Sequence, residues 1–237
     1  RWNGWICKLS AVICHRRLCK KSVKRYGSLS NSNKSRMVDY FEFLQELRRP
    51  WLDVNLLKQK FLALSANAHP DKIHFAGENE KNAAARKFAE LNAAYHCLLE
   101  PKSRLLHLLE LELGAKPKDI QQIPAALADL FAEVATVCKS ADNFLAEKGK
   151  ATSPLLQVQL FERAQEWVEK LNSLQKKLNG LREELTSELR SLDAKWIENN
   201  LEARGGLLKK LEELYRLFSY FNRWNGQIQE RIVQLSL

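Results

Sequence analysis

The sequence predicts an all-α protein, with a four-helix unit followed by a three-helix antiparallel bundle that contains a long coiled-coil-like hairpin. The composition supports helices, because the 237 residues contain only nine Gly and six Pro, and Leu, Ala, Glu and Lys recur throughout. From residue 39 onward, apolar residues recur every three or four positions, which is the spacing of one buried helical face. Isolated Pro and Gly residues divide this pattern into separate helices.

The first two helices are predicted to begin at aspartate N-caps. Asp39 is expected to cap a short helix that ends before Arg49-Pro50. Asp53 is expected to cap a second helix that Pro70 ends. The buried positions expected in these helices are Tyr40, Phe41, Phe43, Leu44 and Leu47, followed by Val54, Leu57, Phe61, Leu64 and Ala68. Residues 71–80 are polar, contain Gly77 and are predicted to form a loop.

Two further helices complete the first predicted domain, residues 37–114. One is expected from about Asn82 to Leu99, and the next from Pro101 to Leu113. Pro at a first helical position and Gly114 just after the last one are the residues that helix ends prefer. The inward positions of the earlier helix are Ala85, Phe88, Leu91, Ala94 and Tyr95. Residues 115–124 contain two prolines and are predicted to be a linker.

Residues 125–237 are predicted to form the bundle. Its first helix carries Leu127, Leu130, Phe131, Val134, Cys138, Ala141 and Leu145 and ends by Gly149. The longest helix opens at Ser153-Pro154, and its seam comprises Leu171, Leu174, Leu178, Leu181, Leu185, Leu189, Leu192 and Trp196. Gly205-Gly206 is expected to form a turn before the last stripe of Leu208, Leu211, Tyr215, Phe218, Phe221, Ile228, Ile232 and Leu235. The seam fits either an intrachain bundle or self-association, so we expect a monomer or a weak dimer.

The net charge of +10 belongs to the N-terminal tail. Ten of the 38 Lys and Arg residues lie within residues 1–36, which contain no acidic residue, so the other 28 balance the 28 Asp and Glu residues. The body therefore has no global basic field, and we expect no nucleic-acid binding by it. No apolar run is long enough to span a bilayer, so a soluble protein is expected.

Three interpretations of residues 1–36 stay open. Met37 is the only Met in the chain, which fits a start of translation there. The tail also fits an organelle transit peptide, or a basic arm for nucleic acid or lipid. We accordingly expect a cytoplasmic protein, or a protein of the mitochondrial matrix if the tail is a transit peptide. Cys7, Cys14 and Cys19 lack the paired spacing of structural zinc sites, so no metal site is predicted.

No catalytic constellation is present, and we expect neither an enzyme nor a bound cofactor. The sequence contains no glycine-rich phosphate loop, no His-Glu-x-x-His motif and no nucleophile in a recognisable setting. Its five His residues are scattered. His96 and His107 are interpreted as groups at the surface or its boundary. Cys97 and Cys138 lie on apolar helical faces and are interpreted as small buried hydrophobic residues.

One tripeptide, His69-Pro70-Asp71, carries functional information. It follows an amphipathic helix, lies in a polar loop and precedes a helix with the sequence KFAELNAAY at residues 87–95. Proline ends the helix and stiffens the turn, and an exposed carboxylate there is able to accept a bidentate arginine from a partner. With Asp39-Tyr40-Phe41 in the first helix, this arrangement resembles the J-domain of the DnaJ family over residues 38–100.

The resemblance implies a co-chaperone that docks on a 70-kDa heat-shock chaperone and stimulates its ATP hydrolysis. The implied contacts are His69, Pro70, Asp71 and Lys72, which meet the junction between the chaperone's ATPase domain and its linker. Lys58 and Lys60, on the outward face of the second helix, are implied to meet an acidic surface; alternatively they only face solvent. Two lysines are fewer than many J-domains display, so weak electrostatic steering is expected.

The order of segments narrows the resemblance. There is no Gly/Phe-rich segment and no Cys-x-x-Cys-x-Gly-x-Gly array, and a helical bundle follows the linker. This order resembles the HscB-type co-chaperones of iron–sulfur cluster assembly across residues 38–235, which implies that the bundle presents a cluster scaffold protein. The implied client-binding residues are Leu127, Leu130, Phe131 and Glu133, although Ala-Thr-Val-Cys-Lys follows where more acids would be expected. A J-domain protein with a different client is the alternative.

Overall fold

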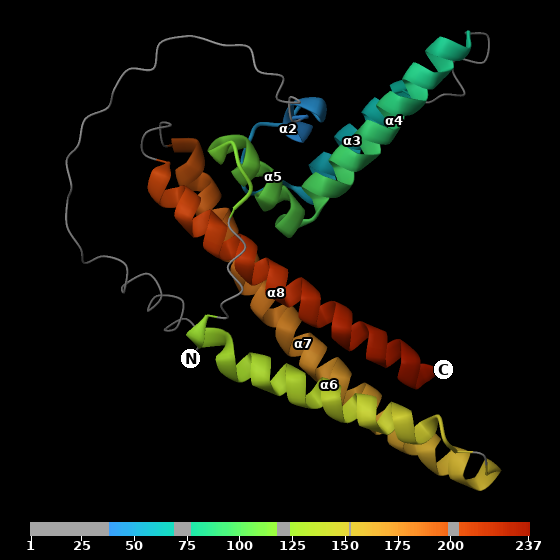
Figure 1. Cartoon of the computed structure of the whole chain (residues 1–237). Helices are drawn as coiled ribbons and strands as arrows, with labels where there is room; N and C mark the ends of the chain where they lie inside the picture. Colours follow the sequence, from blue (N-terminus) through green and yellow to red (C-terminus); the bar gives the residue numbers. More distant parts are fainter. Residues whose placement is uncertain (1–37, 69–76, 118–123, 152, 199–203) are drawn as a thin grey trace, which may run out of the picture.

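The computed structural model describes residues 38–68, 77–117, 124–151, 153–198 and 204–237, and every element in these residues is helical (Figure 1). The helices are α2 (Tyr40–Phe43), α3 (Val54–Ala68), α4 (Glu78–Leu99), α5 (Pro101–Leu113), the 3₁₀ helix η2 (Ala125–Leu127), α6 (Ala128–Lys148), α7 (Pro154–Glu198) and α8 (Gly205–Ser236). We refer to α2–α5 as the N-terminal unit and to α6–α8 as the bundle. The predicted all-α fold is confirmed. Within the described ranges, no helix combines the length and apolarity needed to cross a membrane.

Both predicted aspartate caps are present. The Asp39 carboxylate accepts hydrogen bonds from the backbone N–H groups of Phe41 and Glu42, at 2.9 and 3.3 Å. Asp53 does the same at the start of α3, where it accepts from Asn55 and Leu56. These bonds satisfy amide groups that have no partner inside the helix.

The two caps begin helices whose apolar positions differ from the prediction in part. Helix α2 spans only four residues, because Gln45, just beyond its C-cap, adopts a left-handed φ of 55°. Leu47 therefore lies outside any helix and is 72% exposed, and Val54 at the start of α3 is 50% exposed. Both residues were predicted to be buried, and both predictions were wrong. Leu57 is fully buried, as predicted.

Helix α4 begins at Glu78, earlier than the predicted Asn82. Glu78 and Glu80 lie in its first turn, where acidic side chains interact favourably with the helix dipole, so the polar stretch that suggested a loop continues as helix. Residues 71–76 of the predicted loop lie outside the described residues. Ala85 is exposed rather than buried. Helix α5 ends as predicted at Gly114, which has a φ of 68° and whose N–H donates to the Glu110 carbonyl.

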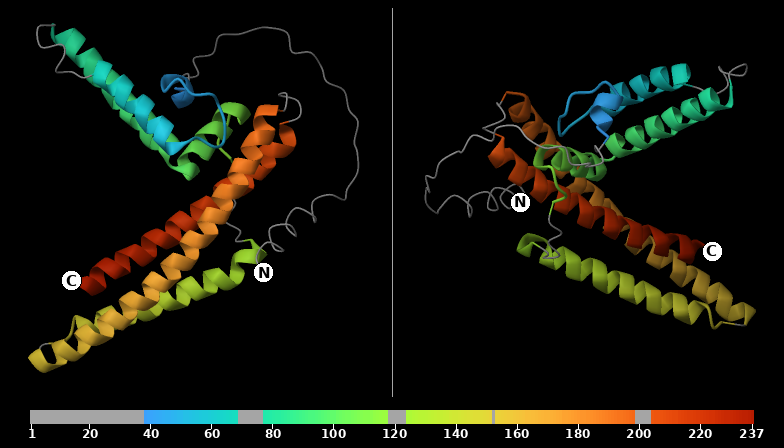
Figure 2. Two further views of the ribbon diagram at one scale, coloured as in Figure 1. Left: turned by 180° about the vertical axis from the view of Figure 1, so that it is seen from behind. Right: turned by 45° about the horizontal axis from the view of Figure 1, so that its top comes forward.

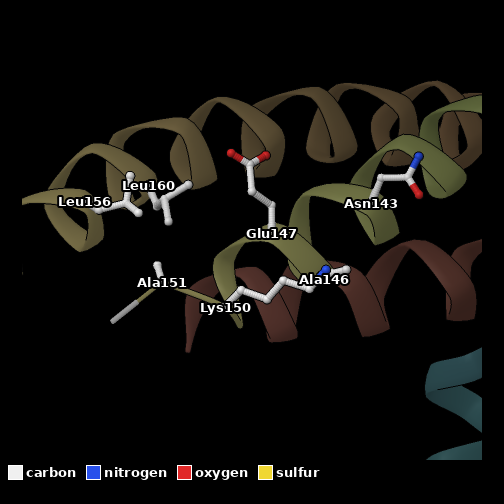
Figure 3. A pocket seen from close by; sticks show the side chains of 7 residues that line it. All are labelled: Asn143, Ala146, Glu147, Lys150, Ala151, Leu156 and Leu160. Atoms are coloured by element: carbon white, nitrogen blue, oxygen red, sulfur yellow. The ribbon is translucent and has the colours of Figure 1, made fainter. Parts of the chain in front are cut away.

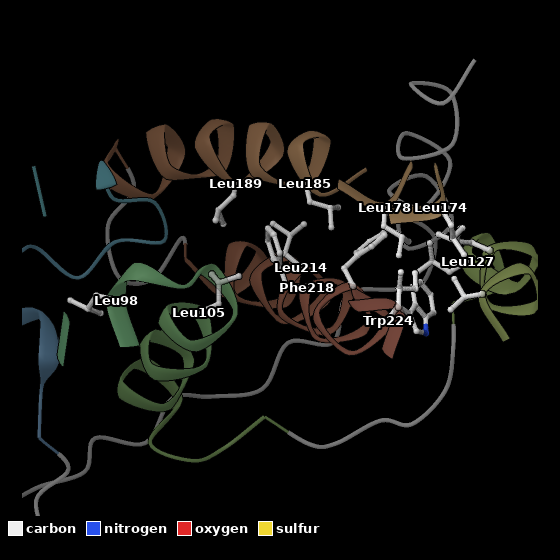
Figure 4. Close-up of a cluster of buried hydrophobic side chains, with 14 of the residues drawn as sticks. Leu98, Leu105, Leu127, Leu174, Leu178, Leu185, Leu189, Leu214, Phe218 and Trp224 are labelled. Carbon is white, nitrogen blue, oxygen red and sulfur yellow. The ribbon is translucent and has the colours of Figure 1, made fainter. Parts of the chain in front are cut away.

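The bundle is built on α7 and α8, helices of 45 and 32 residues that pack along their lengths. The predicted seam is buried within the chain except for Leu181, which is partly buried, and it meets Leu214, Phe218 and Trp224 of α8 (Figure 4). Side-chain amides pair across the same two helices, Gln175 with Gln229 and Asn179 with Asn225. Both pairs are exposed and add polar contacts beside the buried seam. Gly205 and Gly206 open α8 and do not form the turn that was predicted.

The molecule has the shape of a V. Helices α3 and α4 form one arm and α6–α8 form the other, with α5 where the arms meet (Figures 1 and 2). Helix α5 packs on α4 of its own unit and on α8 of the bundle. Leu105, Leu108 and Leu109 of α5 are fully buried in this part of the molecule. The core is therefore continuous from one unit to the other.

Candidate partner-docking surfaces

The α3/α4 arm holds the ends of the segment that contains the His-Pro-Asp tripeptide. Leu57 and Leu91 are buried between the helices, and the Phe61 ring stacks on Tyr95 with 4.2 Å between ring centroids. These contacts pack α3 against α4 along the arm. His69, Pro70, Asp71 and Lys72 lie outside the described residues, so their role as chaperone contacts stays a prediction.

The two lysines predicted to meet a chaperone differ in their surroundings. The Lys60 ammonium pairs with the Glu46 carboxylate at 2.8 Å and donates to the Gln45 carbonyl at 3.0 Å. Its charge is therefore partly neutralised, and it attaches α3 to the segment that precedes it. Lys58 is exposed and forms no ion pair within the described parts of the chain.

His107 anchors α2 on α5. The Tyr40 backbone N–H donates to His107 Nε2 at 3.0 Å, and the imidazole stacks on the rings of Tyr40 and Phe41 at centroid distances of 4.6 and 5.8 Å. His107 is only 5% exposed, so the prediction of a surface or boundary group was wrong. Burial lowers the pKa of His107, because the charged form loses its hydration. The accepted hydrogen bond likewise requires Nε2 to be unprotonated.

Arg104 is a buried cation near the vertex of the V. Its Nε donates to the Pro50 carbonyl at 2.8 Å and its Nη1 to the Leu98 carbonyl at 2.6 Å. The residue is 2% exposed, and burial lowers its pKa to about 10. Arg104 thus joins α5 to the end of α4 and to the segment before α3. Sequence reasoning missed this role, because an arginine next to leucines in a helix has the same local pattern as a surface residue.

A set of contacts that we call the interunit clamp joins the segment before α3 to the end of α7. The Arg49 guanidinium pairs with the Asp193 carboxylate, with Nε at 3.1 Å from both oxygens, and the Trp51 N–H donates to the same carboxylate. The Trp196 indole N–H donates to the Arg48 carbonyl at 2.9 Å. Asp193 is 3% exposed. Its pairing satisfies a charge that would otherwise be costly to bury.

A second polar contact lies where α4 meets α5. The Glu100 carboxylate accepts from Arg182 of α7 at 3.1 and 3.2 Å and from Asn222 of α8 at 3.0 Å. One acid of the N-terminal unit is therefore held by both long helices of the bundle. Together with the clamp, it fixes the angle between the arms of the V.

The predicted client-binding residues separate into two groups. Leu127 and Leu130 are 7% and 4% exposed and belong to the bundle core (Figure 4 labels Leu127). Phe131 is 42% exposed, and Glu133 is exposed but pairs with Lys177 of α7. No contact with a client is present in the structure, so the role of all four stays a prediction.

Sequence reasoning missed two aromatic residues beside Phe131. The Phe131 ring lies 6.4 Å from Trp224 of α8, and the ring of Tyr220 lies 5.9 Å from Trp224. Trp224 is 3% exposed, whereas Tyr220 is half-buried. We call Phe131, Tyr220 and Trp224 the aromatic patch. The i, i+4 spacing of Tyr220 and Trp224 was the available signal, but it does not indicate which helix they face.

Two surface pockets lie on different arms of the V. One, of about 370 Å³, is at the α6–α7 turn, where Leu156 and Leu160 face Glu147 and Lys150 (Figure 3). This turn is at the end of the bundle away from α5 (Figure 1). The other pocket, of about 280 Å³, lies beside α3, and Leu56 and Lys60 are among its lining residues.

The described residues contain no group of three or more His, Cys, Asp or Glu side chains that is arranged to hold a metal ion. Cys138 is buried, as predicted, and Cys97 is half-buried. Burial raises the pKa of Cys97 to about 11, so its thiol is protonated at neutral pH.

Comparison with known sequences points to one group of proteins. No protein-family profile matches the chain. The co-chaperone protein HscB homolog of Shewanella halifaxensis is 33% identical over 75 residues, which is 32% of this chain and 43% of that protein. The HscB homolog of Vibrio cholerae is 35% identical over 75 residues, 32% of this chain and 44% of that protein. The match spans less than half the length of these curated relatives.

Comparison with solved structures extends the likeness to most of the chain. The chaperone HscB from Vibrio cholerae aligns with a TM-score of 0.50 and 19% identity, covering 84% of this chain and 99% of that one. The human co-chaperone protein HscB aligns with a TM-score of 0.51 and 18% identity, covering 93% and 94%. At these identities the alignments establish the fold. The chain is therefore of the HscB type in its fold, and its sequence resembles that of HscB co-chaperones over 32% of its length.

Proposed function

We propose that this chain is a J-domain co-chaperone that stimulates ATP hydrolysis by a 70-kDa heat-shock chaperone and presents an iron–sulfur cluster scaffold protein to it. The observation that carries the proposal is the His69-Pro70-Asp71 tripeptide, which follows α3 directly in a chain with an HscB-type fold. The chain contributes contacts rather than catalytic groups, and the partner ATPase performs the chemistry.

The tripeptide suits a contact that must be both exposed and stiff. Pro70 fixes its own φ and removes a backbone donor, so the helix cannot continue through it. The Asp71 carboxylate is able to accept two parallel hydrogen bonds from a partner arginine, a geometry that supplies both strength and orientation. Lys72, which follows Asp71 in the sequence, and Lys58 of α3 would contribute to the rate of encounter more than to affinity.

Stimulated ATP hydrolysis tests the chaperone contact. Wild-type protein should raise the turnover of its chaperone partner, and Asp71→Asn should weaken docking by about 2 kcal/mol or more, because a partner arginine would lose its charged acceptor. This corresponds to an apparent affinity roughly 30-fold lower. Single-turnover hydrolysis measured against co-chaperone concentration would give that affinity.

Glu78→Gln is the matched control. It removes one negative charge from the same arm, where Glu78 is 85% exposed and lies 3.9 Å from the Lys81 ammonium. We expect this variant to stimulate hydrolysis as the wild type does. Equal stimulation by Asp71→Asn and the wild type would overturn the chaperone contact, and failure of the wild type to stimulate any 70-kDa heat-shock chaperone would overturn the proposed function.

The aromatic patch supports the client half of the proposal. An exposed aromatic side chain seated on a buried tryptophan resembles the anchors that dominate protein–protein interfaces, and Phe131 and Trp224 form such a pair. Leu127 and Leu130 lie beneath this surface, where they hold α6 in place. Glu133 should contribute little to client binding, because its carboxylate already pairs with Lys177. That ion pair is nearly half-exposed and is therefore weak.

Binding of a purified iron–sulfur scaffold protein tests the client assignment. Phe131→Ala should weaken that binding about tenfold by removing the exposed ring, as isothermal titration calorimetry would measure. Val158→Ala is the control, because Val158 is 62% exposed on α7, near its start. Scaffold binding that is unchanged in Phe131→Ala, or absent in the wild type, would reject this client surface.

A further inference from the structure

One side of α3 is exposed, uncharged and largely apolar. At 3.6 residues per turn, five of its residues cover roughly one third of the helix circumference. These residues, which we call the neutral face of α3, are Leu56, Gln59, Leu62, Ala63 and Ala66, and all of them are exposed; the uncharged amide Asn55 is also exposed and lies on the same side. Leu56 is 58% and Leu62 54% exposed, while Leu57 on the opposite side is fully buried. The two leucines lie at the two margins of one face, so they are not isolated surface residues.

The positive charges beside this face are few. Lys58 lies at one edge and is exposed. Lys60 lies at the other edge, where Glu46 and the Gln45 carbonyl hold its ammonium. Among the described residues of α3, Lys58 is therefore the one lysine without an ion pair, and a single such cation produces a weak field at a distance. An acidic partner surface would therefore gain little from this helix.

The neutral face is continuous along the chain with the proposed chaperone contact. Helix α3 ends at Ala68, and the next residue is the first of the tripeptide. A chaperone that contacts the tripeptide therefore comes close to the last two turns of α3, which contain Leu62 and Ala66. Beside Leu56, at the other margin of the face, lies the 280 Å³ pocket, whose lining combines the apolar Trp51, Leu52 and Leu56 with the charged Glu46, Arg49, Asp53 and Lys60.

We infer that the neutral face of α3 docks on an apolar surface of the same 70-kDa chaperone, so that this helix binds by burial of Leu56 and Leu62 rather than by charge attraction. The inference rests on the proposed function and specifies the chemistry of that contact. It identifies Leu62 as a specificity-determining residue, because a chaperone with an acidic patch at this position would leave Leu62 against charged groups. Selection among chaperone paralogues would then depend on apolar complementarity.

Two substitutions at position 62, one that shortens the side chain and one that adds a positive charge, test the inference. Leu62→Ala should weaken the apparent affinity in chaperone stimulation about tenfold, as expected when a buried leucine is truncated. Leu62→Lys should weaken it at least as much, because an ammonium would face an apolar surface. An acidic partner surface predicts the reverse, since Leu62→Lys would then tighten binding. Whether Leu62→Lys weakens or tightens binding therefore distinguishes an apolar partner surface from an acidic one.

Salt dependence provides a second readout. Raising the ionic strength from about 0.05 M to about 0.2 M shortens the screening length roughly twofold. Wild-type affinity should change less than about threefold over this range, since few charge pairs are screened. Lys58→Ala should weaken docking by no more than about twofold. A steep salt dependence, or a larger loss in Lys58→Ala than in Leu62→Ala, would overturn the inference.

Val158→Lys is the matched control, because Val158 is as exposed as Leu62 but lies on the bundle. It should leave stimulation unchanged.

Sedimentation velocity tests whether a second copy of this chain covers the neutral face. The inference would be overturned if the wild type is a dimer, Leu62→Lys dissociates it, and stimulation stays intact. If Asp71→Asn loses stimulation while both Leu62 variants dock normally, the apolar contact of α3 is rejected and the proposed function stands. If the wild type does not stimulate the chaperone, both the apolar contact and the proposed function are rejected.

Discussion

Single buried polar residues determine how the N-terminal unit holds together. His107 and Arg104 both lie in α5, at 5% and 2% exposure. Each binds backbone groups from a distant part of the chain, His107 the Tyr40 N–H and Arg104 the Pro50 carbonyl. A buried polar group that loses its partner costs more free energy than the bond contributes when it forms. These two residues therefore specify one arrangement of α2, α4 and α5.

His107 makes stability depend on pH. Burial lowers its pKa in the folded state, so below the unfolded value of about 6.5 the unfolded chain binds more protons than the folded one. Its stabilising contribution is present above that value and is lost as pH falls. The free energy of unfolding of the wild type should therefore decrease from about pH 7 to about pH 5.

His107→Gln isolates this contribution. Gln supplies a neutral acceptor for the Tyr40 N–H but does not titrate, so its unfolding free energy should decrease less over the same pH range. Urea unfolding of both proteins at the two pH values would measure the difference. Parallel pH profiles for the wild type and the variant would contradict the assignment, whatever the stability of the variant at neutral pH.

At the scale of the helices, capping residues in the sequence predicted some helix ends correctly and others not. The Asp39 and Asp53 caps and the left-handed Gly114 are local features, because each depends on residues within one turn of the helix end. The seam of α7 was equally predictable, since leucine spacing repeats over many turns. The start of α4 was not, because a polar stretch that contains Gly is typical of a loop as well as of an acidic first turn.

Gly114 provides a prediction at this scale. An added Cβ would meet nothing within 4 Å, so the cost of Gly114→Ala arises from its φ of 68° alone. We expect the free energy of unfolding to fall by about 1 kcal/mol. Gly226→Ala should act in the opposite direction by about 0.5–1 kcal/mol, because Gly226 is exposed inside α8, where Ala is the better helix former. Chemical denaturation of both variants would test these signs, and a change of the same sign in both would contradict the argument.

For the whole molecule, the contacts that set the angle of the V were the hardest to predict. Arg49 and Asp193 are 144 residues apart, and neither has a sequence neighbourhood that distinguishes it from a solvated charge. Tertiary proximity decided which charges were buried. The candidate client surface shows the same limit, since Phe131 was identified from its own helix while Trp224 and Tyr220 required the position of α8.

Asp193→Asn should destabilise the protein and loosen the V. The variant leaves Arg49 without its anionic partner, and we expect the free energy of unfolding to fall by about 2–3 kcal/mol. This is below the range for a fully buried pair, because the Arg49 side chain is 28% exposed. The radius of gyration from small-angle X-ray scattering should rise as the arms separate. Glu147→Gln is the control, because its ion pair with Arg163 is half-exposed on both sides, and solvent screens such a pair so that its loss should change neither stability nor the radius of gyration appreciably.

The contacts at the vertex also set the distance between the two candidate docking surfaces. Arg104, Glu100 and the interunit clamp link the two arms at the vertex, and these contacts restrain the span between the end of the α3/α4 arm and the aromatic patch. Under the proposed function, a chaperone held at one end would meet a client at a set separation, which would raise effective concentration only for a client whose dimensions match that gap. Client size would then be a criterion of selection, in addition to the chemistry of either surface.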